Sequence, residues 1–578
     1  MVNDLLGRCT TCFIFLIPAA LMFSLLIGVP AQVQAQEKID QINRAAEQIQ
    51  REQQERQQQL LKNKQPGKQT SPQKLPEVKL PSLPKGGTCR EIRKIVLTGV
   101  TLLPKNVTQA LVAPYQGKCL YAEDIEKLLA DILKAYIDRG YIAVRPYIQA
   151  QDLSTGRLEI LILEGKVERL NLQDDGKHSI NLTTAFPFVK GKPLNLRDIE
   201  QGLEQINRLA SNNATMEISP GAESGESIIN IINTPSFPLS AYISLNNLGS
   251  KSTGEKQGSI TLSMDNPLHL NDFLTYTHSR TLFEPDRFRD SSSNSFFYSL
   301  PLGYWTLQQS YSFSEYRTPV ITSVATLVAR GDSETYRAEL NWVAYRDQNQ
   351  KLTTLLAINK KSFNNYLDDE FLSVSSRKLT IFDVGMNWNR RFPRLSVNLG
   401  LSWSKGLSWF GALKDPDGLD ATAPHAQGSV FRYSGGMQVP FPVLGRVFSF
   451  SSQLTGQYAM QPLYGSEQIT IGSYYSVRGF NRYSLAGDRG YFVRNELSSS
   501  LPKLSFVGIT ARFFLGLDAG RILGYKNTDS ANLSGAAAGI RFAGKHLSAE
   551  LSVAKSLSVP DTIEREPEQY FATVTANF

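Results

Sequence analysis

The 578-residue sequence predicts two small α+β modules followed by a large all-β transmembrane barrel of sixteen antiparallel strands, preceded by an N-terminal helix. Three observations lead to this prediction. An apolar segment opens the chain, two stretches of similar mixed pattern follow, and from about residue 240 apolar and polar residues alternate with a period of two. Such alternation over many long strands is typical of a barrel whose outer face meets lipid and whose lumen is polar.

The composition narrows the class of protein. Charged residues make up 20% of the chain, the net charge is +8 and the mean hydropathy is −0.23. Beyond about residue 30 there is no apolar run of roughly 18 residues, which excludes a protein with several membrane-spanning helices. The basic residues are spread along the chain rather than gathered into a stripe, so nucleic acid is not expected as a partner.

Residues 1–35 are predicted to be a secretory signal peptide. Arg8 precedes a nearly continuous apolar stretch over 13–29, and Val33-Gln34-Ala35 fits the small-residue rule before a cut at Gln36. The alternative is an uncleaved membrane anchor, because the apolar stretch is rather long. Either reading places the rest of the chain outside the cytoplasm.

The predicted signal peptide decides which cysteines remain in the exported chain. Cys9 and Cys12 lie within the signal segment, so the exported chain keeps only Cys89 and Cys119. Two thiols in an oxidising compartment are expected to form one disulfide. Their spacing fits no zinc site, and two free buried thiols are the less favoured alternative.

The next two segments differ sharply in composition. Residues 36–62 are predicted to be a helix, since from 37 to 62 they contain no Gly or Pro and show a narrow apolar stripe among eight glutamines. A helix of this length spans roughly 39 Å. It is either a solvated, coiled segment or a plug in a water-filled lumen. Residues 63–87 contain five prolines and five lysines and are expected to form an extended linker.

Two modules with the order β-α-α-β-β are expected over 88–165 and 166–236. In the first, the apolar spacing of residues 125–137 is that of an amphipathic helix ended by Gly140. The repeat length of roughly 75 residues indicates tandem domains. The expected elements are 92–97, 104–113, 125–137, 141–150 and 157–164 in the first module, and 167–172, 180–186, 196–209, 215–219 and 227–232 in the second.

Residues 237–578 are assigned to the barrel. A soluble β-sandwich would alternate in the same way, but rarely with so many strands of spanning length. The final strand places Tyr570 and Phe578 on one face, which resembles the C-terminal aromatic signal for insertion of bacterial outer-membrane barrels. The expected strands are 239–248, 257–265, 271–280, 293–300, 304–316, 334–347, 350–362, 376–391, 393–407, 428–440, 446–460, 489–500, 508–520, 533–544, 546–557 and 568–578.

The sequence gives no reason to expect an enzyme, a metal or a cofactor. The five histidines are scattered, and neither a metal-ligand pair nor a nucleophile elbow occurs. Gly539 to Lys545 has the spacing of a P-loop, but His546 stands where Ser or Thr is required and a β-hairpin is expected there. No catalytic, cofactor-binding or metal residue is therefore assigned.

The most informative motif is Val477-Arg478-Gly479-Phe480, in a long stretch without alternation between two strands. It resembles the loop tip of the Omp85 superfamily. This resemblance implies that the loop folds back into the barrel lumen and that Arg478 pairs with an aspartate on a following strand, here Asp518.

Strand parity supports the same assignment independently. Because Leu515 and Leu517 are expected to face lipid, Asp518 should face the lumen, and by the same count Arg494 and Glu496 point inward. A guanidinium in a narrow lumen needs a carboxylate partner, because an unpaired and poorly hydrated charge is costly. The alternative places Arg478 on a surface loop.

The two modules resemble POTRA domains, and the whole exported chain is similar to the two-partner secretion transporters, the TpsB class of the Omp85 superfamily. Several motifs resemble the haemolysin secretion/activation (ShlB/FhaC/HecB) branch: the pair Cys89 and Cys119, residues 137–141, Asn207-Arg208-Leu209 and residues 262–268. One departure is Ala210, where the family usually has Pro after Asn-Arg-Leu.

This resemblance implies an outer-membrane transporter of a Gram-negative bacterium, with its POTRA domains in the periplasm. Its expected partner is a large secreted hemolysin, adhesin or contact-dependent toxin with an N-terminal β-helical secretion domain. Outer-membrane lipid and the barrel-assembly machinery are further expected partners. The alternative is an Omp85-type insertase, for which more POTRA copies and no plug helix would be expected.

Overall fold

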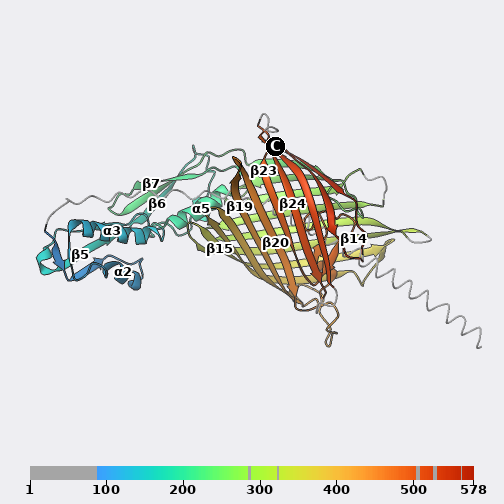
Figure 1. Ribbon diagram of the computed structural model, residues 1–578, viewed down its shortest axis with the longest axis horizontal. Coiled ribbons are helices and arrows are strands. Elements are labelled where there is room, and N and C mark those ends of the chain that lie inside the picture. Colours follow the sequence, from blue (N-terminus) through green and yellow to red (C-terminus); the bar gives the residue numbers. More distant parts are fainter. Residues whose placement is uncertain (1–87, 284–287, 322–324, 503–507, 525–529, 562) are drawn as a thin grey trace, which may run out of the picture.

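The computed structural model describes residues 88–578 except 284–287, 322–324, 503–507, 525–529 and 562. Two small domains lie one after the other at one end of a closed barrel (Figure 1). The signal predicted over 1–35, the helix over 36–62 and the linker over 63–87 lie outside the described residues. Among the helices of the described ranges, none is both long and apolar enough to cross a membrane.

The first domain packs two helices on a three-stranded sheet of order β2-β5-β4. Leu128, Ile132 and Tyr136 recur along one face of the long helix α3 and are almost completely buried against the sheet. The elements are β1 (Arg90–Ile92), β2 (Lys94–Thr98), α2 (Lys105–Val112), β3 (Lys118–Leu120), α3 (Ala122–Ile137), β4 (Arg145–Tyr147) and β5 (Arg157–Leu163).

Glu164, at the end of β5, joins the helix and the sheet of this domain. Its carboxylate accepts hydrogen bonds from the backbone N–H groups of Thr101 and Leu102 at 2.8 and 2.9 Å and from the Tyr136 hydroxyl at 2.7 Å. Burial opposes its ionisation, but the hydrogen bonds prevail and lower the pKa of Glu164. An ionised carboxylate therefore fixes the loop before α2.

Two features of the first domain differ from the sequence prediction. The strand expected over 141–150 is only β4, because Pro146 offers no N–H and β4 lies at the sheet edge. A separate pair, β1 with β3, was not predicted, and the Cys89–Cys119 disulfide lies beside it with a Cα–Cα distance of 5.3 Å. The predicted disulfide is confirmed.

The second domain repeats the pattern with a sheet of order β6-β8-β7. Asn195 caps α5 by accepting a hydrogen bond from the backbone N–H of Arg197 at 2.9 Å, as its position predicts. The elements are β6 (Lys166–Gln173), α4 (Leu182–Ala185), α5 (Leu196–Asn207), β7 (Thr215–Pro220) and β8 (Glu226–Ile232), which match the expected order.

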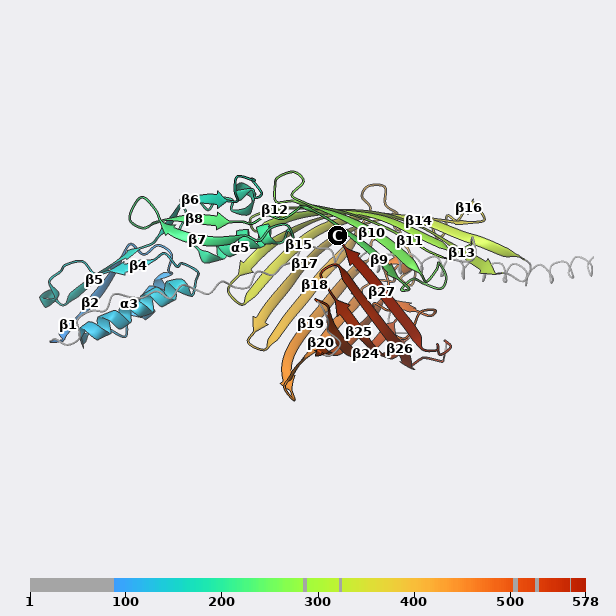
Figure 2. The ribbon, with the colours of Figure 1, turned by 90° about the horizontal axis from the view of Figure 1, so that it is seen from above.

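The barrel contains sixteen antiparallel strands closed between β9 and β27, as predicted, with the two-residue β16 attached to β15. Figure 2 shows the second domain beside the barrel end that carries the short turns. The strands are β9 (Leu239–Asn246), β10 (Gln257–Asp265), β11 (Phe273–Thr281), β12 (Asp290–Leu302), β13 (Trp305–Ile321), β14 (Thr326–Arg346), β15 (Gln350–Leu367), β17 (Arg377–Phe392), β18 (Leu395–Leu407), β19 (Ser429–Val443), β20 (Arg446–Ala459), β23 (Arg489–Ser500), β24 (Thr510–Leu523), β25 (Ser530–Ala543), β26 (Leu547–Ser558) and β27 (Gln569–Asn577).

The wall has an apolar outside and a polar inside. On β24, Leu515 and Leu517 are exposed on the outer face while Asp518 is buried inside. Tyr570 and Phe578 are also exposed on the outer face, and the Phe578 N–H donates to the carbonyl of Ala241 at 2.9 Å where the barrel closes. On β24, the side chains that the sequence pattern predicted to face lipid or the lumen do so in the structure.

Candidate functional site

The loop tip, Val477 to Phe480, lies inside the barrel. It belongs to a segment that leaves the short strand β21 (Ile469–Ile471) and returns through β22 (Leu485–Gly487), its antiparallel partner. Val477 and Phe480 are fully buried and pack on Ile471 and on the inward side chains Ile522 and Leu533 of the wall. Two apolar anchors on either side of Arg478 thus set its position.

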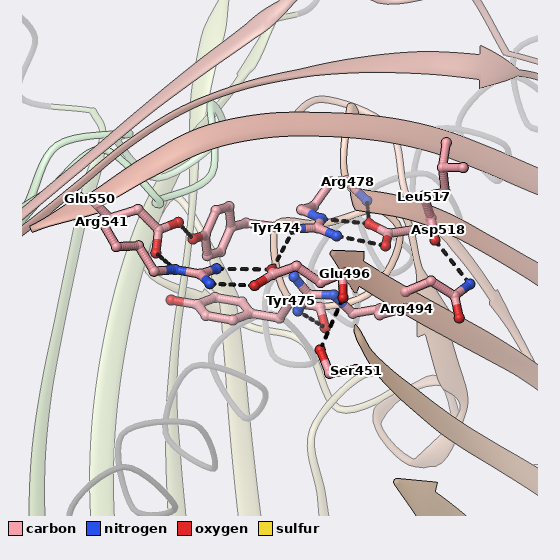
Figure 3. Close-up of polar contacts among 11 residues, drawn as sticks. Ser451, Tyr474, Tyr475, Arg478, Arg494, Glu496, Leu517, Asp518, Arg541 and Glu550 are labelled. Atoms are coloured by element: carbon pink, nitrogen blue, oxygen red, sulfur yellow. Dashed lines mark hydrogen bonds and ion pairs between the residues drawn. The ribbon is translucent and has the colours of Figure 1, made fainter. Parts of the chain in front are cut away.

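Arg478 forms a bidentate ion pair with Asp518 on β24 (Figure 3). Its Nε donates to Asp518 Oδ2 at 2.6 Å and its Nη2 donates to Oδ1 at 2.8 Å. The backbone N–H of Arg478 also donates to Oδ2, at 3.1 Å. Both residues are 2–3% exposed, so the pair is almost completely shielded from water.

Three glycines make room for the loop tip, and sequence reasoning missed this contribution. A Cβ at Gly535 would lie 1.8 Å from the Arg478 carbonyl oxygen, and one at Gly516 would lie 2.1 Å from Arg478 Nη2. Gly479 has φ +100°, and a Cβ there would lie 2.5 Å from the backbone of Lys555 on β26. Gly535 thus leaves room for the backbone of Arg478, Gly516 leaves room for its guanidinium, and Gly479 lets the loop approach β26.

The charge network continues from Arg478 along the inner face of the neighbouring strands β23 to β26. Arg478 Nη1 lies 3.4 Å from Glu496 Oε2, and Arg541 Nη2 donates to the same Glu496 oxygen at 3.0 Å. Arg541 Nε then donates to Glu550 at 2.7 Å, and Glu550 accepts from the Tyr474 hydroxyl of the loop. We call Arg478, Glu496, Asp518, Arg541 and Glu550 the lumenal cluster (Figure 3).

Arg494 also faces inward, as parity predicted, but it contacts the loop differently. Its Nη1 donates to the backbone carbonyl of Tyr475 at 3.2 Å (Figure 3). Phe514 lies beneath the cluster, with the guanidinium of Arg541 4.0 Å from the centre of its ring. Arg541, Glu550 and Phe514 were not identified from the sequence, although their inward parity on β24, β25 and β26 was a usable signal.

A second carboxylate holds the chain just after the loop tip. Glu566, which is buried between β26 and β27, accepts hydrogen bonds from the backbone N–H groups of Asn481, Arg482 and Tyr483 at 2.9–3.2 Å. Nothing in the sequence pointed to Glu566, because it lies in a connection without alternation. The loop is therefore held at both sides of its apolar anchors.

A separate polar contact region joins the second POTRA-like domain to the barrel, and we call it the joint. Glu204 of α5 accepts from Arg346 Nη1 at 2.5 Å and from Lys351 Nζ at 2.6 Å, at either side of the β14–β15 turn. Gln201 and Gln205 both donate to the carbonyl of Gly303 in the β12–β13 turn, at 3.1 and 2.9 Å. The helix is thus fixed to two adjacent turns.

The motif Asn207-Arg208-Leu209 occupies the centre of the joint. Arg208 donates to the carbonyls of Asn271 and Ser299 at 2.8 and 3.1 Å, and Leu209 is fully buried against Phe273 and Phe297 inside the barrel mouth. The sequence suggested only that this motif marks a family. In the structure it attaches the domain to the inner wall.

Two acidic residues of the joint have shifted pKa values. Burial raises the pKa of Asp198, although the Tyr304 hydroxyl donates to it at 2.7 Å. Burial also acts on Glu204, but the charges of Lys351 and Arg346 outweigh it and lower the pKa of Glu204. The hydrogen bond from Tyr304 thus links Asp198 of α5 to the β12–β13 turn across the joint.

The predicted site residues fall into three places. Val477, Arg478, Gly479, Phe480, Asp518 and Glu496 come together in the lumen, with Arg494 beside the loop. Cys89 and Cys119 lie in the first domain, and Tyr570 and Phe578 lie on the outer wall. Within the described ranges, no group of three or more His, Cys, Asp or Glu side chains is arranged to hold a metal ion.

Comparisons with known proteins place this architecture in a family. The model described as haemolysin secretion/activation protein ShlB/FhaC/HecB matches residues 225–542. The chain belongs to this family. A ShlB-type POTRA domain model matches residues 91–165 and another POTRA model matches residues 166–220, so the two α+β domains are POTRA domains.

Similar proteins support the assignment. The outer membrane transporter CdiB of Dickeya dadantii (strain 3937) is 35% identical over 478 residues, which cover 82% of this chain and 84% of that protein. The hemolysin transporter protein ShlB of Serratia marcescens is 31% identical over 78% of each chain. The solved structure of CdiB from Escherichia coli superimposes with a TM-score of 0.83 at 32% identity, covering 92% of this chain and 98% of that one.

Membership in this family makes the chain an outer-membrane transporter of two-partner secretion, with its POTRA domains in the periplasm. The predicted family, fold and location are confirmed. The family consists of transporters. The lumenal site of this chain is built from ion pairs and from contacts to the backbone of the loop.

Proposed function

We propose that the chain exports one large partner protein of the hemolysin, adhesin or contact-dependent toxin class. The POTRA domains capture the unfolded partner in the periplasm, and the barrel passes it to the cell surface. As the resemblance implied, the partner carries an N-terminal β-helical secretion domain, the barrel sits in outer-membrane lipid, and the barrel-assembly machinery inserts it.

The free sheet edges of the POTRA domains support capture of an extended segment. β7 is an edge strand of the order β6-β8-β7, and β4 is an edge strand of the order β2-β5-β4. An edge strand offers unpaired backbone N–H and C=O groups, which bind an extended polypeptide without strict demands on its sequence. This suits a partner that arrives unfolded.

The single observation that carries the proposal is the Arg478–Asp518 pair. It holds a loop, rather than a strand, against the inner wall of the conduit. We propose that this pair keeps the loop tip in its secretion-competent position. A loop can leave the wall while the sixteen strands stay closed. The pair therefore controls whether the loop blocks the lumen, and it does so without opening the barrel wall.

The test is export of a co-expressed large protein with an N-terminal β-helical secretion domain, measured at the cell surface in cells with and without the transporter. Export that depends on the transporter, with unchanged levels of other outer-membrane proteins, supports the proposal. Normal export without the transporter contradicts it. A general loss of other barrels would instead favour the alternative insertase.

A further inference from the structure

The connection after α4 in the second POTRA domain carries an unusually exposed aromatic residue. Phe188 is 88% exposed and has φ +64°, a backbone conformation that bulky residues rarely adopt. Phe283 and Phe410 are also exposed at positive φ, but they lie in barrel loops, whereas Phe188 belongs to a POTRA domain at the barrel rim.

The position of Phe188 is fixed relative to the barrel rim. The Gly303 N–H of the β12–β13 turn donates to the carbonyl of Thr184 at 2.8 Å, and the ring of Pro187 packs so closely that a Cβ at Gly303 would lie 2.6 Å from it. Thr184 also donates to the carbonyl of Leu270 in the β10–β11 turn, at 3.0 Å. The chain just before Phe188 is therefore held against two turns at the periplasmic end of the barrel.

These turns lie at the periplasmic edge of the lipid-facing surface of the barrel. Leu302 and Trp305 flank Gly303 and are 48% and 42% exposed, and Leu268 of the neighbouring turn is 61% exposed. Trp305 stacks on Trp342 with ring centres 5.4 Å apart. Aromatic residues at the end of a barrel strand mark the interface between hydrocarbon and headgroups. Phe188 extends this apolar edge from the barrel onto the POTRA domain.

The charges next to Phe188 fit the same partner. Lys190 and Lys192 follow in the same connection, and both are exposed. An aromatic side chain flanked by lysines is suited to a bilayer surface, because the ring enters the acyl boundary while the ammonium groups meet lipid phosphates.

We propose that Phe188, Lys190 and Lys192 form a membrane contact of the second POTRA domain, with the phospholipid of the periplasmic leaflet as its partner. The ring inserts beside Leu302 and Trp305, and the two lysines bind phosphate groups. The contact holds the domain that receives the partner protein at a fixed height below the barrel.

The test places the photo-crosslinking residue p-benzoylphenylalanine at position 188 of the full chain in nanodiscs of phosphatidylethanolamine and phosphatidylglycerol. The matched control replaces Ile218, a 40% exposed residue on the free edge of β7, in the same way. Adducts are identified by mass spectrometry on protein whose heat-modifiable migration shows a folded barrel. We expect a phospholipid adduct at position 188 in several-fold excess over position 218.

Equal lipid adducts at both positions, or none at 188, would overturn the proposal. An adduct at 188 with a co-expressed partner protein in place of lipid would also overturn it and assign the face to the exported chain. In the Lys190→Gln/Lys192→Gln variant the lipid adduct should fall several-fold, and an unchanged yield would contradict the phosphate contact.

Discussion

The lumenal cluster and the joint both pair arginine with carboxylate, but they distribute the charges differently. In the lumen, the side chains of Arg478 and Asp518 are 3% and 0% exposed and form one bidentate pair in a slot of glycines. In the joint, Glu204 is 26% exposed and shares its charge between Arg346 and Lys351, which are 12% and 32% exposed. In the lumen, Glu496 is a second and more distant partner of Arg478, at 3.4 Å, whereas in the joint the charge of Glu204 is divided between two close cations.

This difference indicates two roles for similar chemistry. Loss of one partner of a pair that is shielded from water is costly, because the other charge stays buried without its closest counter-charge. A shared and partly hydrated set loses stability gradually, since water and a second cation replace what is lost. The loop is thus built to occupy one position, and the joint is built to stay attached while the conduit works.

The largest expected effect is that of the buried pair. Arg478→Ala should destabilise the loop position by about 3–5 kcal/mol, because it leaves Asp518 buried without its bidentate partner. Asp518→Ala should destabilise it less, because Glu496 still lies 3.4 Å from Arg478. Export of the partner protein should fall strongly while heat-modifiable migration still shows an inserted barrel. The double variant should be no worse than the worse single one, because the same interaction cannot be lost twice.

A matched control for this pair is Arg512→Ala, which removes an exposed arginine from the same strand, β24. It should leave export unchanged. Wild-type export from both single variants, at equal barrel levels, would show that the loop does not depend on this pair.

The next effect concerns the slot itself. Gly535→Ala should destabilise the seated loop by about 1–3 kcal/mol through overpacking against the backbone of residue 478. Protease sensitivity of the loop should increase and export should fall. Gly435→Ala on β19 is the control, since a Cβ there would meet its nearest atom at 3.5 Å, an ordinary contact. Equal behaviour of the two variants would contradict the slot.

A smaller effect is expected at the joint. Glu204→Gln should weaken docking of the second POTRA domain by about 1–2 kcal/mol, because charge-assisted hydrogen bonds are lost while those of Gln201 and Gln205 remain. Spin labels at Glu223→Cys and Arg394→Cys should show a broader distance distribution. Glu217→Gln, on the exposed edge β7, is the control and should not broaden it. A broadening as large as that from loss of Leu209 would show that the contacts are not shared.

The smallest effect is the acid sensitivity of the joint. Glu204 has a lowered pKa when docked, relative to its ordinary value of 4.5, so its contribution is complete above that value. The contribution is lost as the pH falls through the docked pKa. The same spin-label distances should therefore broaden in acid below pH 4.5 in the wild type. In Glu204→Gln this broadening should disappear, and its persistence would assign the acid sensitivity to another group.

The sequence alone determined the strand number, the parity of the wall and the two POTRA domains. These features arise from local patterns, since a period of two fixes which side chains face lipid, and the spacing of residues 125–137 fixes a helix face. The Arg478–Asp518 pair could also be predicted, because a motif named one partner and parity placed the other in the lumen.

Only the tertiary structure decided what surrounds these residues. Gly516 and Gly535 form a slot because two neighbouring strands present them to the same residue, Gly516 to the guanidinium of Arg478 and Gly535 to its backbone. The sequence does not show which atoms approach a glycine in a strand. Glu566 and the Arg208 contacts likewise join residues far apart in the chain. Such contacts form only when the barrel closes and the second domain docks. Neither event produces a periodic pattern of residues that the sequence could show.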